Sequence, residues 1–214
     1  MESEAYPGRP ARNASNTWDR QSFAPGDGIP ALDALMQLLH AKDGYTASHC
    51  WRVSSLTRLA GPRMGLEPLE LRTAVLAAFY HDIGKLGIVN SVLSKPGQLT
   101  ASEWRSIIVH PTIGRELLES FLSVQRAALV IQQHHESWDG SGYPMSLTEE
   151  EILPEARILR VCDVYDALVS DRPYRPAYAH SEAIEMIVNG IGTEFEPVAA
   201  EALLTITDEL HKAA

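Results

Sequence analysis

The sequence predicts an all-α protein, a compact multi-helix bundle. Two observations indicate the fold: apolar residues recur at three- and four-residue steps from Ile29 onward, and no alternating run of strand length appears. The length of 214 residues suits one domain, which at this size buries roughly 70% of its unfolded surface. We therefore expect a single domain over residues 29–214, without internal repeats.

Residues 1–28 are expected to be a disordered leader. They are rich in Gly, Pro, Ser, Asn and Arg and show no helical period. They contain no apolar signal-peptide core, and no apolar run approaches the roughly 18 residues that span a bilayer. Two cysteines are too few for a disulfide scaffold. These features predict a soluble, cytoplasmic protein without a membrane span.

The first half of the domain is expected to contain three helices and then an extended connection. Apolar residues recur at helical spacing over 29–39 and again over 53–60. The next segment, 70–80, ends in a run that is apolar on all sides, which marks a buried helix. Glycine and proline residues then break the chain over 84–97, where we expect an extended connection.

The second half carries clear helix start signals. Thr100 followed by Glu103 is typical of a capping box, and Pro111 suits the first turn of the next helix. A helical period continues over 124–138, a glycine-rich loop follows at 139–144, and Pro154 can open a helix that runs to about Ser170. Two weaker helices are expected at 181–190 and 197–211.

The charge balance excludes one class of function. Eighteen basic residues against 28 acidic ones give a formal charge of −10, so binding of a nucleic-acid polymer by bulk charge is not expected. A phosphorylated ligand would have to be held by a local group of cations or by metal ions.

Of the eight histidines, His40, His180 and His211 are expected at the surface or at caps. The other five histidines and two aspartates lie on or at the end of a predicted helix with an apolar inner face. The seven are His49, His81, Asp82, His110, His134, His135 and Asp163. Taken singly, each is most simply a hydrogen-bonded core histidine or a capping aspartate. Taken together they indicate a metal centre, because imidazole and carboxylate suit Zn, Fe and Mn. Seven ligands fit two ions that share a carboxylate better than one ion.

The motifs resemble those of the HD-GYP family, a branch of the HD-domain metal-dependent phosphohydrolases. The resemblance runs from Asp43 to about Ala177, and its most specific part is the double histidine followed eight residues later by a Gly-Tyr-Pro loop. The matching segments are DGYTASH at 43–49, HDIGK at 81–85, KPGQLT at 95–100, HP at 110–111, HHESWDGSGYP at 134–144, ARI at 156–158, DVYDAL at 163–168 and RPYR at 172–175.

The resemblance implies a bacterial cyclic di-GMP phosphodiesterase that cleaves the 3′-5′ phosphodiester bond, to pGpG and/or GMP, with a hydroxide activated by two metal ions. It assigns the same seven residues as metal ligands, with Asp82 as the bridge and with Fe or Mn favoured over Zn or Ni. Asp82 and Lys85 would be catalytic, and Lys85 would also meet a substrate phosphate. Tyr143, Arg172 and Arg175 would bind the nucleotide. Cyclases of the same signalling system are the protein partners that the resemblance suggests.

The sequence departs from the family pattern at two places, and several of the assigned residues have an alternative role. Tyr45 stands where some members carry a glutamate that helps hold a third ion, so two ions are expected, and Val89-Asn90 replaces a common Pro-Asp. Lys85 is alternatively a cap of helix carbonyls. Tyr143 is alternatively a turn residue packed on Pro144. Arg172 and Arg175 are alternatively charges that complement a helix dipole.

Asp166 and Glu136 are expected to orient histidines or to act as caps. Two other functions stay open from the sequence. One is an HD phosphohydrolase of another nucleotide, such as a hybrid cyclic dinucleotide or an alarmone. The other is a non-catalytic scaffold that binds cyclic di-GMP.

Overall fold

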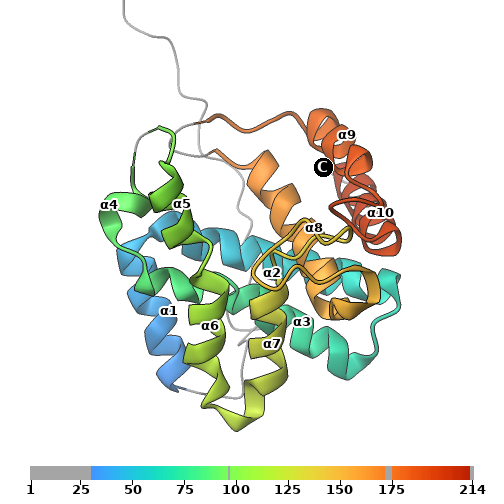
Figure 1. Ribbon diagram of the computed structural model, residues 1–214. Coiled ribbons are helices and arrows are strands. Elements are labelled where there is room, and N and C mark those ends of the chain that lie inside the picture. Colours follow the sequence, from blue (N-terminus) through green and yellow to red (C-terminus); the bar gives the residue numbers. More distant parts are fainter. Residues whose placement is uncertain (1–29, 96, 172–174, 213–214) are drawn as a thin grey trace, which may run out of the picture.

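The computed structural model describes residues 30–95, 97–171 and 175–212 and confirms the all-α prediction. Within these ranges the chain forms α-helices and short 3₁₀ turns and no strand, and Ile191 and Phe195 form an isolated bridge (Figure 1). The expected leader, residues 1–28, lies outside the described residues. No helix in the described part of the chain combines the length and the apolar character needed to cross a membrane.

Three helices form the middle of the bundle: α2 (Gly44–Met64), α3 (Pro68–Tyr80) and α8 (Pro154–Val169), each packed against the other two. The Asp43 side chain accepts hydrogen bonds from the backbone of Tyr45 and Thr46 at the start of α2. The apolar run of α3 is buried as expected, and Tyr80 is 1% exposed. These helices position one side of the polar centre described below.

The remaining helices surround this middle layer. α1 (Pro30–Lys42) and α10 (Pro197–Lys212) pack on α2, α6 (His110–Glu119) packs on α7 (Gln125–Gln133), and α9 (His180–Asn189) packs on α8. The short elements are η1 (Ile83–Gly87), α4 (Asn90–Leu93), α5 (Ala101–Ile107), η2 (Leu122–Val124) and η3 (Glu149–Glu151). The predicted Thr100 capping box, the prolines in the first turns of α6 and α8, and both C-terminal helices are confirmed.

The expected extended connection over 84–97 is wrong, because η1 and α4 occupy much of it. A 3₁₀ turn needs only local bonds, such as Lys85 N–H to the Asp82 carbonyl at 2.9 Å, and tolerates glycine. Gly84 has a packing role instead: a Cβ at that position would overlap the backbone carbonyl of His110. The glycine therefore lets η1 lie directly against α6 rather than extending the chain.

The expected helix over 124–138 is also too long, since α7 ends at Gln133. The His134 ring explains the early end: its Nδ1 donates to the Ile131 carbonyl at 2.6 Å, while the His134 backbone N–H bonds the same carbonyl at 3.5 Å in a 3₁₀ pattern. The two histidines that follow α7 thus leave the helix and turn into the centre of the bundle.

Candidate metal centre

The structure brings all seven residues of the histidine–aspartate set into one cluster. They come from α2, the ends of α3 and α7, the start of α6, and the middle of α8. Six of them are buried, between 0% and 7% exposed, and His135 is half-buried. An apolar core cannot compensate the desolvation of so many buried polar groups. The contacts that these groups make with one another therefore decide what the cluster can do.

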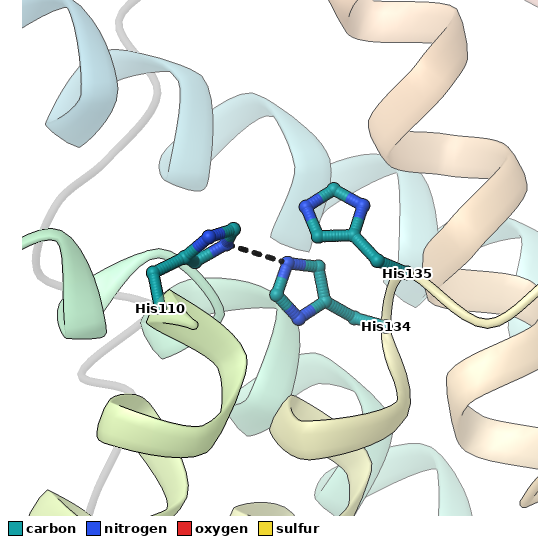
Figure 2. Close-up of side chains that lie close together, drawn as sticks. All are labelled: His110, His134 and His135. Carbon is teal, nitrogen blue, oxygen red and sulfur yellow. Dashed lines mark hydrogen bonds between the residues drawn. The ribbon is translucent and has the colours of Figure 1, made fainter. Parts of the chain in front are cut away.

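The cluster contains two separate groups of potential ligands. His49, His81 and Asp163 form one, and His110, His134 and His135 form the other; within each group one ligand atom per residue lies within 4.8 Å of the others. Figure 2 shows the second group, with the rings gathered from α6 and from the turn after α7. Two groups of three donors have the composition expected for two divalent ions.

Asp82 lies between the two groups. Its Oδ2 is 3.5 Å from His81 Nε2, and its Oδ1 is 3.3 Å from His110 Nε2. The carboxylate therefore directs one oxygen toward each group, which is the arrangement that a bridging ligand requires.

Three histidines satisfy the last carbonyls of the helix or turn that precedes them. Nδ1 of His81, His110 and His134 lies 2.6–2.8 Å from the carbonyl oxygen three residues earlier, and a carbonyl can only accept, so Nδ1 donates. These bonds fix the ring orientations and leave Nε2 for the centre. An outer hydrogen bond of this kind is typical of metal-binding histidine.

One contact tests directly whether the donors fit a cation. His110 Nε2 and His134 Nε2 are 3.3 Å apart (Figure 2), and both rings already commit Nδ1 as a donor. Two neutral rings would thus turn two lone pairs toward each other. The pair needs a cation between its nitrogens, either a proton or a metal ion, and the imidazole–carboxylate set fits a divalent metal.

Asp166 orients His49, as the sequence suggested. Its Oδ2 lies 2.7 Å from His49 Nδ1, and Arg52 Nε donates to its Oδ1 at 2.7 Å. The other ring nitrogen, Nε2, faces Asp163 Oδ1 at 2.8 Å. Glu136 has the capping role instead, because it accepts from the backbone of Met145 and holds the loop after the double histidine.

Burial and charge act in opposite directions on the cluster. Burial lowers the pKa of His49, but hydrogen bonds to Asp163 and Asp166 outweigh it and raise this pKa to about 9. Burial likewise lowers the pKa of His81, and the Asp82 charge is the chief reason that it rises to about 9 instead. Burial dominates at His134 and holds its pKa well below the usual value.

The free energy of unfolding of the metal-free protein is expected to fall as the pH rises from about 6.5 to about 9. His49 and His81 have a pKa of about 9 in the folded chain against 6.5 in the reference state, so the folded state binds more protons across this window. Their stabilisation is complete below pH 6.5 and is lost as the pH passes 9. Urea unfolding in the presence of a chelator, repeated over this range, measures it.

A matched variant, His49→Gln, removes one of the two titrating rings and should flatten this profile. A wild-type stability that stays level or increases between these pH values would contradict the protonation pattern.

Lys85 is at the cluster and not at a helix carbonyl. Its Nζ lies 2.6 Å from Asp82 Oδ2, and 22% of its side chain is exposed. Burial lowers the pKa of Lys85, yet the Asp82 charge outweighs burial and raises it above the usual value, so the side chain stays cationic. The structure thus places one cation at the edge of the centre, within reach of solvent.

The two predicted nucleotide contacts that the structure describes, Tyr143 and Arg175, touch different parts of the protein. The Tyr143 ring stacks on His135, with centroids 4.8 Å apart. Arg175 donates to the carbonyl of Ala167 at 2.8 Å, near the end of α8, and lies over the Tyr178 ring. For Arg175 this is the helix-terminus alternative raised above. Arg172 lies outside the described residues.

Three residues at the site were missed from the sequence. Cys50 forms a further potential ligand group with His81 and Asp82. Arg160 donates to His135 Nδ1 at 2.9 Å, and Trp104 of α5 sets its ring edge-on to Tyr143 with centroids 6.3 Å apart. Two signals were available: Cys50 directly follows a candidate ligand, and Arg160 lies one helical turn before Asp163.

Comparison with known proteins adds three similarities. The chain is 41% identical over 175 residues to the cyclic di-GMP phosphodiesterase response regulator RpfG of Xanthomonas campestris, covering 81% of this chain and 46% of that protein. It is 34% identical to the 3′3′-cGAMP-specific phosphodiesterase 3 of Vibrio cholerae, covering 80% of this chain and 37% of that protein. The chain thus spans less than half the length of these curated relatives.

The structure is similar to Bd1817, described as an HDG"Y"P protein of Bdellovibrio bacteriovorus, with a TM-score of 0.61 at 19% identity over 83% of this chain and 60% of that one. Residues 33–198 match the HD domain family. Fold and site together define a helical domain built around a buried histidine–aspartate centre. The chain belongs to the HD-domain family, and its motifs place it in the HD-GYP branch.

Proposed function

We propose that this domain is a metal-dependent phosphodiesterase that hydrolyses a 3′-5′ bond of cyclic di-GMP, to pGpG and/or GMP. The observation that carries the proposal is the complete histidine–aspartate cluster with Lys85 Nζ 2.6 Å from Asp82. Similarity to a phosphodiesterase of cyclic di-GMP over 81% of the chain supports the substrate.

The proposed ligands of two divalent ions are His49, His81, Asp82, His110, His134, His135 and Asp163, with Asp82 as the bridge. Fe or Mn is the proposed pair on the strength of the HD-GYP resemblance, since imidazole mixed with carboxylate also suits Zn or Ni. Tyr45 supports two ions rather than three, since it stacks on His49 and offers no carboxylate. When bound, two such ions supply a nucleophile from water at neutral pH and neutralise phosphoryl charge.

Within this proposal Lys85 binds and positions the scissile phosphate. Its ammonium now pairs with Asp82, and bound ions would compensate that carboxylate and release Nζ toward a phosphate oxygen. A fixed cation at a phosphoryl group stabilises the charge that develops as the bond to the 3′ oxygen breaks. The leaving 3′ oxygen would take its proton from solvent, which reaches the edge of the centre at the partly exposed Lys85 side chain.

Tyr143 is proposed as the guanine contact, and Arg172 and Arg175 as further nucleotide contacts. The Tyr143 ring stacks on His135 and lies near Trp104, with centroids 4.8 and 6.3 Å away respectively. An aromatic face beside the metal ligands suits a base, and such stacking contributes about 1–3 kcal/mol. Arg175 would have to leave the α8 carbonyls to take part.

One observation favours a second candidate substrate. The Vibrio cholerae relative at 34% identity is named for 3′3′-cGAMP, and the metal chemistry does not separate the two nucleotides. The contacts around Tyr143 would decide between them. A cytoplasmic location and association with cyclases are proposed on the same grounds as the substrate.

Product analysis tests the proposal. Protein purified anaerobically and loaded with Mn²⁺ is expected to convert cyclic di-GMP to pGpG or GMP. Chromatography of the reaction mixture identifies these products. A panel that includes 3′3′-cGAMP and an alarmone serves as the comparison. Rapid loss of another nucleotide with cyclic di-GMP intact would replace the substrate, and binding of cyclic di-GMP without turnover by fully metallated protein would favour a scaffold.

A further inference from the structure

Four of the five clustered histidines share one hydrogen-bond pattern. Nδ1 of His81, His110 and His134 donates to a backbone carbonyl, and Nδ1 of His49 lies 2.7 Å from the Asp166 carboxylate. Oxygen acceptors of this kind require hydrogen on Nδ1. In each of these rings Nε2 is consequently the nitrogen that faces the centre, and it can bind an ion once it carries no proton.

His135 breaks this pattern. Its Nδ1 lies 2.9 Å from Nη1 of Arg160, and a guanidinium is permanently protonated and can only donate. Nδ1 of His135 must therefore accept. The single proton of the neutral ring is then on Nε2. The lone pair of Nδ1 accepts from Arg160, and the protonated Nε2 has no lone pair available. In this arrangement His135 has no free lone pair for an ion.

The position of Arg160 is itself well supported. Its Nη2 donates to Glu194 Oε1 at 2.6 Å, and 17% of its side chain is exposed. The Glu194 carbonyl accepts from the backbone N–H of Trp138 at 3.2 Å, which ties this contact to the loop after the double histidine. The Nε of Arg160 is buried and has no hydrogen-bond partner among the described residues.

We propose that Arg160 is a positioning residue that controls whether His135 can act as a metal ligand: its hydrogen bond to Nδ1 holds His135 outside the ligand set until that bond breaks. The inference rests on the proposed metal centre. Filling the His110–His134–His135 group with all three rings therefore requires Arg160 to release His135.

The tautomer of His135 can be observed without any metal. Long-range ¹H–¹⁵N NMR spectra of the chelator-treated wild-type protein are expected to show Nδ1 unprotonated in His135 and protonated in His49, His81, His110 and His134. Loss of one signal set in His135→Gln assigns the ring. A protonated Nδ1 on His135 would overturn the proposal, and this result does not depend on any Arg160 variant.

Substitution of the arginine tests the effect on metal binding. In Arg160→Met, His135 is expected to change tautomer, and the Mn²⁺ ion at the His110–His134–His135 group is expected to bind on the order of tenfold more tightly, since partners of metal ligands change affinity by such factors. Free Mn²⁺ measured by electron paramagnetic resonance gives the affinity. Arg157→Met is the matched control, because Arg157 lies one turn earlier on α8 and pairs with Glu196.

Unchanged or weaker Mn²⁺ binding in folded Arg160→Met would overturn the proposal that Arg160 restrains His135. Failure of the proposed function gives a different result: wild-type protein would bind no Mn²⁺ at all, whatever the tautomer of His135.

Discussion

Asp82→Asn is expected to remove bound metal and to lower the hydrolysis of cyclic di-GMP by at least about 10³-fold. Asp82 directs one oxygen toward each ligand group, at 3.5 Å from His81 Nε2 and 3.3 Å from His110 Nε2. The amide keeps the shape of the side chain but loses its charge and one acceptor oxygen. Metal ions contribute several kcal/mol to such reactions, and each 1.36 kcal/mol is a factor of ten in rate.

Elemental analysis of the purified variant and chromatography of the products measure both effects. Asp208→Asn is the matched control, because Asp208 is an exposed residue of α10 that pairs only with Lys212 among the ion pairs described. Circular dichroism checks that each variant is folded. An Asp82→Asn protein with full metal content and full turnover would refute the two-ion proposal, and the same holds for His81→Ala.

Lys85→Met is expected to keep its metal and to lose turnover by about 10²-fold, the usual cost of removing one donor that stabilises transition-state charge. Methionine retains the apolar stem but not the ammonium that lies 2.6 Å from Asp82. Metal content measures whether the ligands of this variant are intact, and turnover measures the loss of the contact between Lys85 and the phosphate.

Lys212→Met, at the exposed end of α10, is the control for loss of one positive charge. Unchanged turnover in Lys85→Met would remove Lys85 from the reaction. Loss of metal from the same variant would show that its contact with Asp82 supports the centre instead.

Local signals in the sequence were sufficient for most helices. The capping box at Thr100, the proline in the first turn of α8 and the apolar run of α3 each act within a few residues, so their spacing predicts structure directly. Elements decided by distant contacts were predicted wrongly. Gly84 was interpreted as a chain break, but its lack of a side chain serves the close approach of η1 to α6.

The sequence by itself determined the helical class, the family and the seven residues that gather in the core, because periodicity and motif spacing are local properties of the chain. Only the tertiary structure decided how those residues meet. The thiol of Cys50 beside His81 and the contact of Arg160 with His135 across 25 residues depend on packing between helices. Hydrogen bonds between remote side chains depend on distances of a few tenths of an ångström, which no pattern along one chain specifies.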